Sequence, residues 1–249
     1  MATAFHPSAA SLTCVVLVAY LLAHSSHAVA LSTALPLTLP LTPQQWQEVR
    51  LADDIRPNMF VFETVQDEQV LRIESDASMS MMATSIDVDL TKTPVLCWRW
   101  RVNRVLEKAD MTERFGDDYA ARLYLSVAIP DADKSLGLRL QLGLARSIWG
   151  DQVPDGAINY VWDNRQPVET VMDNAYTDRV AMVVVQSGSD RVGQWVQQSR
   201  DVAQDIKQRF TPSAKAVQIA LAADTDNTGE TVRAEFADIR FAANAASCQ

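Results

Sequence analysis

The strongest strand signal in this sequence is the run Val95-Leu96-Cys97-Trp98-Arg99-Trp100-Arg101-Val102. Successive side chains of a strand point to opposite faces, so one face receives the leucine, both indoles and the last valine. The other face receives the cysteine and both guanidinium groups. Indole rings carry a large apolar area that is buried on folding, whereas a guanidinium group needs water or an anion. The run therefore predicts a strand with one buried face and one polar face.

The same division recurs along the chain. Residues 121–129 alternate apolar side chains with Arg122, Tyr124 and Ser126, and residues 138–144 alternate four leucines with Arg139 and Gln141. Further runs typical of strands lie at residues 59–65, 69–75, 78–86, 158–162, 180–185, 216–222 and 231–241. The spacing of apolar residues predicts one short helix over residues 196–210. Roughly ten strands and one helix predict an all-β fold, an antiparallel β-sandwich of the jelly-roll kind.

The first thirty residues have the composition of a leader. They contain no Asp, Glu, Lys or Arg, and an apolar run at residues 12–23 precedes Ala28-Val29-Ala30, which has the form of a signal-peptidase site. We therefore predict a signal peptide over residues 1–30 and a periplasmic or secreted protein; an uncleaved anchor is the alternative. An extended lead-in at residues 31–45, a single sandwich domain at 46–243 and a tail at 244–249 complete the predicted organisation.

Cleavage of this leader would restrict the available chemistry. All three histidines, His6, His24 and His27, lie within it. The mature chain would then hold no Ser-His-Asp triad, no Cys-His dyad and no histidine-ligated zinc site. The remaining cysteines, Cys97 and Cys248, either pair in an oxidising compartment or stay as two thiols.

The charge of the chain argues against two classes of partner. The sequence has 22 Lys and Arg against 31 Asp and Glu, which gives a formal net charge of -9. Proteins that bind nucleic acid or an anionic membrane present a basic excess. We therefore predict neither partner, and no membrane span after the leader is removed.

Five motifs occur here in one order along the chain: residues 94–100, 116–122, 159–162, 200–202 and 224–229. The series resembles a bacterial exported family, the domain of unknown function 3047, over nearly the whole predicted mature chain. This resemblance implies an exported single domain with a lectin-like or galactose-binding-like sandwich. It supplies no catalytic residue.

Polar side chains from three predicted strands would share a sheet face if those strands lie side by side. The candidate ligand-binding residues are Arg99, Arg101, Arg122, Tyr124, Arg139 and Gln141. Arginine forks pair with carboxylate, sulfate or phosphate groups, so this face predicts a groove for an anionic glycan or another acidic ligand. The alternative is that each arginine bridges an Asp or Glu on a neighbouring strand.

The same residue types allow a catalytic interpretation. Jelly-roll polysaccharide lyases remove the proton beside a uronate carboxylate with Tyr or His, while Arg and Gln neutralise that carboxylate. Tyr124, together with Arg122, Arg139 and Gln141, would supply these groups. Glycoside hydrolysis ranks lower because it needs a carboxylate separation that a sequence does not give.

The loop Asp224-Thr225-Asp226-Asn227-Thr228-Gly229, with Glu235 further on, resembles a calcium-binding loop. The candidate metal ligands are Asp224, Asp226, Thr228 and Glu235. Strands flank this loop, however, and a polar hairpin explains the same residues without metal. Asp117 and Asp118, together with Asp238, form a second candidate, although contacts with Arg114 or Arg122 are the interpretation we prefer. No other cofactor is predicted.

The sequence thus favours an exported β-sandwich that binds a carbohydrate or cell-envelope ligand, anionic ligands included, on an arginine-rich sheet face. One alternative is a lyase or hydrolase of acidic polysaccharide on the same scaffold. The other is a structural module of the envelope without a ligand.

Overall fold

The tryptophan-rich run forms strand β6 (Val95–Val102) in the computed structural model, and it lies at the centre of the core. Trp98 and Trp100 are fully buried and meet edge to face, with ring centroids 5.5 Å apart. Trp98 also packs on Tyr160, and Trp100 packs on Trp162 and Phe236. The indole face predicted to be buried is therefore the face that joins the two sheets.

Two sheets pack face to face around this aromatic cluster. Sheet A has the order β11 (Val196–Asp201), β6, β13 (Thr231–Ala242), β4 (Glu68–Asp76) and β3 (Met59–Val65), and β1 (Leu37–Thr38) pairs with β13. Sheet B has the order β2 (Gln47–Val49), β5 (Met81–Ser85), β12 (Lys215–Asp224), β7 (Tyr119–Ala128), β8 (Gly156–Asp163), β10 (Thr177–Ser187) and β9 (Val171–Asn174). The predicted all-β sandwich is confirmed, with one departure: β8 and β10 pair in parallel.

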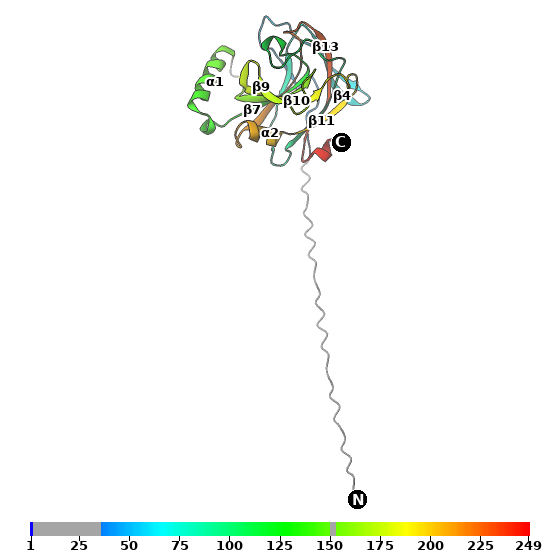
Figure 1. Ribbon diagram of the computed structural model, residues 1–249, viewed down its shortest axis with the longest axis vertical. Helices are drawn as coiled ribbons and strands as arrows, with labels where there is room; N and C mark the ends of the chain where they lie inside the picture. Colours follow the sequence, from blue (N-terminus) through cyan, green and yellow to red (C-terminus); the bar gives the residue numbers. More distant parts are fainter. Residues whose placement is uncertain (2–35, 150–152) are drawn as a thin grey trace. The chain divides into compact units, whose positions relative to one another are not determined.

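The sequence interpretation was wrong in two helical regions. Residues 138–144 were expected to form a strand but belong to α1 (Leu136–Trp149), which lies outside the two sheets (Figure 1). Residues 196–201 were expected to be helical but form β11, which pairs antiparallel with β6. The helix begins only afterwards, as α2 (Val202–Arg209).

The structure describes Met1, residues 36–149 and residues 153–249, and the backbone alone for 145–149. The predicted signal peptide at residues 1–30 lies outside the residues described here. Part of the predicted lead-in packs on the sandwich, because β1 pairs with β13 and Leu41 is buried. Residues Thr33–Gln249 form one compact unit.

A disulfide between Cys97 and Cys248 joins β6 to the C-terminal 3-10 helix, η3 (Ala245–Cys248). Of the two alternatives left open by the sequence, the structure shows the pairing. The two cysteines pack with Val95 and Ala242 in a small buried cluster. The predicted tail is therefore fixed to β6, the strand next to the edge strand β11 of sheet A.

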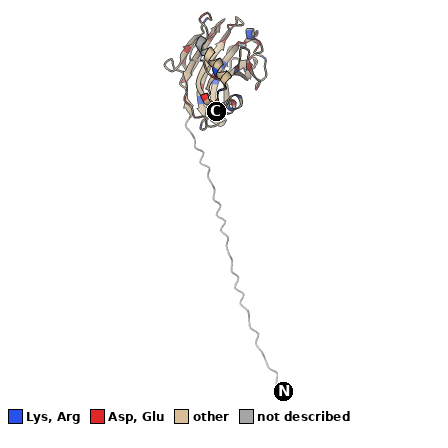
Figure 2. Cartoon of the chain, turned by 90° about the vertical axis from the view of Figure 1, so that its left-hand side faces the viewer, with Lys and Arg blue, Asp and Glu red and all other residues tan. Residues whose placement is uncertain are grey.

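Acidic and basic positions are mixed along strands and loops (Figure 2). None of the helices in the described part of the chain has the length and apolar character required to cross a membrane.

Candidate functional site

The outer face of sheet B, which points away from the aromatic core, carries the polar side chains of β7. Leu123 and Leu125 point inward and are fully buried in the core, so Arg122 and Tyr124 point outward. On β12 the residues paired with Tyr124 and Arg122 are Ala220 and Ala222. These small side chains leave space beside the two larger ones, and the face is hollowed there.

This hollow is a pocket of about 450 Å³, which we call the sheet B pocket. Its polar wall is formed by Asp117, Arg122, Tyr124, Asn174, Tyr176, Thr177, Asp224, Asp226 and Asn227. Its apolar wall is formed by Leu51, Ile55, Met79, Met81 and Val180. Concave sites with an apolar lining and a few convergent polar groups are typical of small-molecule binding.

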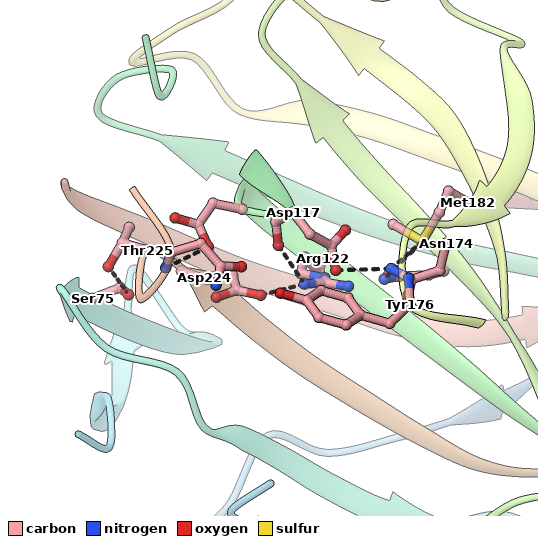
Figure 3. A network of polar contacts seen from close by, with 12 residues as sticks. Ser75, Asp117, Arg122, Asn174, Tyr176, Met182, Asp224 and Thr225 are labelled. Atoms are coloured by element: carbon pink, nitrogen blue, oxygen red, sulfur yellow. Dashed lines mark hydrogen bonds and ion pairs between the residues drawn. The ribbon is translucent and has the colours of Figure 1, made fainter. Parts of the chain in front are cut away.

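Arg122 is the centre of the polar wall and is only 4% exposed. Its guanidinium forms an ion pair with Asp224 and donates to the backbone carbonyl of Asp117 at 3.4 Å (Figure 3). The polar contacts around Asn159 assign its amide oxygen to the side facing Arg122, where it accepts hydrogen bonds of 2.7 and 3.0 Å. The guanidinium also lies over the rings of Tyr119 and Tyr124, 4.6 and 4.8 Å from their centroids. These contacts hold the Arg122 side chain in one conformation, so its guanidinium is already in position when a ligand enters the pocket.

Asn174 extends this network toward β9. Its side-chain amide donates to Asp117 Oδ2 at 2.8 Å, and Figure 3 shows it on the side of Arg122 opposite Asp224. Tyr176 follows in the turn between β9 and β10, and its hydroxyl donates to the backbone carbonyl of Arg114 at 2.8 Å. The guanidinium of Arg114 lies over one face of the Tyr176 ring, 5.4 Å from its centroid, but Tyr176 is 52% exposed, so the rest of the ring is available to a ligand.

The protonation of Tyr124 bears on catalysis. Burial raises the pKa of its phenol above the ordinary value, although the charge of Arg122 opposes the shift. The phenol is therefore neutral near pH 7 and is a poor base. A tyrosine that removes a proton from a sugar acid would need the opposite shift.

Three carboxylates meet at the edge of the pocket, and we call Asp118, Asp224 and Asp226 the aspartate cluster. One carboxylate oxygen from each residue lies within 4.8 Å of the others. Burial raises the pKa of Asp224 well above its ordinary value, the neighbouring Asp226 and Asp118 add to the shift, and Arg122 opposes it. Asp118 is held by the backbone N–H groups of Asn227 and Thr228, at 3.3 and 2.7 Å.

The prediction that the six candidate ligand-binding residues share one sheet face is wrong. Arg122 and Tyr124 lie on sheet B, whereas Arg99 and Arg101 lie on the outer face of sheet A, and Arg139 and Gln141 lie on α1. The prediction assumed that the strands carrying these residues were neighbours, but β6 and β7 belong to different sheets and residues 138–144 form no strand.

The arginines of sheet A follow the alternative interpretation. Arg99 pairs with Glu68 and Arg101 pairs with Glu235, each across the sheet. Trp195 packs against both guanidinium groups, 5.3 and 4.9 Å from its ring centroid. Carboxylates therefore already neutralise the charge that was expected to attract an anionic ligand.

The structure also does not bring all four predicted metal ligands together. Asp224 and Asp226 come together, and Thr228 adjoins them through its backbone contact with Asp118. Glu235 does not lie near them, because the chain crosses to sheet A after the loop and Glu235, on β13, pairs with Arg101. Asp118 occupies the position expected of Glu235, whereas Asp238 instead pairs with Arg240.

Several pocket residues were missed from the sequence. Asn174 ends β9 and Tyr176 lies in the turn that follows, with no motif of their own. Met79 and Met81 belong to a run that was predicted only as a strand. The stretch Asp173-Asn174-Ala175-Tyr176-Thr177-Asp178 holds polar residues around one aromatic residue, which is the single signal that could have drawn attention to this part of the pocket.

Comparison with solved structures gives distant similarity. The xyloglucanase domain of NopAA, a type three effector from Sinorhizobium fredii in complex with cellobiose, is 11% identical, with 85% of this chain and 99% of that chain covered and a TM-score of 0.41. The Clostridium thermocellum endo-1,4-beta-D-xylanase 10B CBM22-1–GH10 modules, complexed with xylohexaose, are 10% identical, with a TM-score of 0.35. The alignment covers 85% of this chain but spans only 28% of the xylanase chain.

No curated protein matches the sequence. Residues 44–240 do match a family, described as protein of unknown function (DUF3047). The match covers most of the chain and confirms the resemblance stated from the five motifs. The chain belongs to the DUF3047 family.

Proposed function

We propose that this protein is an exported β-sandwich that binds a saccharide in the sheet B pocket. The observation that carries the proposal is the composition of that pocket: an accessible tyrosine ring, a fixed arginine, an amide and carboxylates around a volume of about 450 Å³. Sugar hydroxyl groups donate to carboxylates and accept from guanidinium and amide groups, while the C–H face of a pyranose ring packs on an aromatic side chain.

A neutral saccharide fits the pocket better than an anionic one. Asp117, Asp224 and Asp226 line the pocket, and Arg122 is the one arginine among the lining residues. An acidic sugar entering this site would meet carboxylates of like charge in partly desolvated surroundings. Neutral ligands therefore replace the anionic ligands expected from the sequence.

Export is supported by the bridge between Cys97 and Cys248, since disulfides form and persist in oxidising compartments. The apolar leader at residues 12–23 and the small residues at 28–30 support the same proposal. A protein in that compartment would meet polysaccharides of the cell envelope or of the surroundings.

The test is a glycan array of neutral and acidic saccharides, probed with the wild-type protein and with Tyr176→Ala. We expect binding to neutral saccharides and about tenfold weaker binding for the variant, a loss of roughly 1.4 kcal/mol, because the stacking ring is removed. Trp195→Ala is the matched control, since it removes an aromatic side chain from the outer face of sheet A.

Two results would overturn this proposal. One is a wild-type protein that binds no saccharide on the array; the other is binding that Trp195→Ala reduces and Tyr176→Ala does not.

Any saccharide that binds is then incubated with the protein and assayed for new reducing ends and for the ultraviolet absorbance of unsaturated uronates. Turnover abolished by Asp226→Asn would move the proposal from a binding protein to an enzyme.

A further inference from the structure

Asp224 carries a buried carboxylate oxygen without a hydrogen-bond partner. The residue is 3% exposed, and its Oδ2 atom pairs with Arg122. Its Oδ1 atom is buried and finds no donor among the described residues. Buried polar atoms in folded proteins are nearly always paired, so an orphaned carboxylate oxygen points to a bound cation or water.

The charges around this atom do not balance within the described part of the chain. Asp117 and Asp224 lie beside Arg122, and Asp118 and Asp226 lie beside Asp224, so four carboxylates share one guanidinium. Among the described residues, neither Asp118 nor Asp226 forms an ion pair, and Lys108 reaches the loop only at the backbone carbonyl of Thr228. A second positive charge would relieve the repulsion between these carboxylates.

The spacing of the aspartate cluster fits one cation. Oxygens bound to a single calcium lie about 2.3–2.6 Å from it, and hence up to about 5 Å from one another. The three cluster oxygens lie within 4.8 Å of one another. Two of the ligands come from β12 and the loop after it, while Asp118 is fixed against that loop by two backbone N–H groups.

We propose that the aspartate cluster binds a calcium ion, with Asp224 Oδ1 and one carboxylate oxygen each from Asp118 and Asp226 as ligands. An all-oxygen set with carboxylates of variable spacing suits calcium, whereas zinc prefers nitrogen and sulfur ligands and magnesium demands a tight octahedron. Asp224 and Asp226 also line the sheet B pocket, so the ion forms part of its wall. The proposal does not depend on what the pocket binds.

The experiment is a titration of the EDTA-dialysed protein with calcium chloride by isothermal titration calorimetry. We expect one ion per chain, with a Kd on the order of 10⁻⁴ M, as in extracellular calcium modules. At about 10 mM calcium, Tm should rise by roughly 5–10 °C. Asp226→Asn should weaken binding at least tenfold; Asp226 is partly exposed and has no ion-pair partner among described residues, so this variant is expected to fold.

Asp190→Asn is the matched control, because Asp190 is an exposed aspartate in another loop of the sandwich. It should bind calcium as the wild-type protein does. Terbium luminescence gives a second measurement, since a terbium ion at this site would lie near Tyr119 and Tyr124, which pack on the partner of Asp224. The proposal fails if calcium gives neither heat nor a Tm shift, or if Asp226→Asn and Asp190→Asn bind calcium equally. A displaceable terbium signal unchanged in Asp226→Asn would also overturn it.

Discussion

Arg122 shows how one residue organises the site. It contacts Asp224, Asp117 and Asn159 and lies over the rings of Tyr119 and Tyr124, so its guanidinium is satisfied although it is buried. The alternation of β7 predicted from the sequence that Arg122 and Tyr124 leave the core on the same side. It could not predict that Asp224 closes the contact, because that depends on the pairing of β12 with β7.

The buried pair of Arg122 and Asp224 should matter far more for stability than an exposed pair. Arg122→Met leaves Asp224 buried beside other carboxylates, and we expect a loss of about 3–5 kcal/mol in the free energy of unfolding, measured by urea denaturation. Adding Asp224→Asn to that variant should recover part of the loss, because the unpaired charge disappears.

Arg56→Met is the control for this measurement. It breaks an ion pair with Asp76, at 2.9 Å, whose side chains are 64% and 60% exposed. We expect a loss of less than about 1 kcal/mol there, since exposed pairs contribute little. Equal losses in Arg122→Met and Arg56→Met would show that the buried pair has no special role.

At the scale of the elements, the sequence predicted strands well where alternate side chains pack into the core, as in β6 and β7, and poorly elsewhere. The leucines at residues 136, 140 and 144 recur every four positions, so the apparent alternation of residues 138–144 fits a helix equally well. These three leucines are 66–77% exposed, so no buried sheet face selects the strand. In β11, by contrast, pairing with β6 overrides a helical spacing.

The boundary between β11 and α2 depends on a helix cap. Asp201 accepts a hydrogen bond from the backbone N–H of Gln204 at 2.9 Å, whereas the neighbouring Arg200 pairs with Asp205. Asp201→Ala should lower the free energy of unfolding by about 1 kcal/mol in urea denaturation. Asp201→Asn keeps the acceptor and should stay within a few tenths of the wild-type value; an equal loss in both variants would contradict the capping role.

For the whole molecule, composition and alternation were enough to predict a sandwich, since alternating strands need a second layer to cover their apolar faces. The order of strands was not predictable in the same way. Consecutive strands β12 and β13 belong to different sheets, and this crossing separates Glu235 from Asp224. The pairing of β12 with β7, in contrast, brings Asp118 into the aspartate cluster. Contacts between residues more than a hundred positions apart leave no periodic signal in the sequence.

The disulfide between Cys97 and Cys248 should be a main source of the stability of the fold. The bridge from Cys97 to Cys248 spans 151 residues and ties the C-terminal end to β6, so it restricts the unfolded chain strongly. Cys248→Ser, or treatment of the wild-type protein with a reductant, should lower the free energy of unfolding by roughly 2–5 kcal/mol in urea denaturation. The variant should then be insensitive to the reductant, which separates loss of the bridge from any other effect of reducing conditions. If oxidised and fully reduced wild-type protein unfold at the same urea concentration, the bridge does not stabilise the sandwich, and the C-terminal helix η3 is held by packing alone.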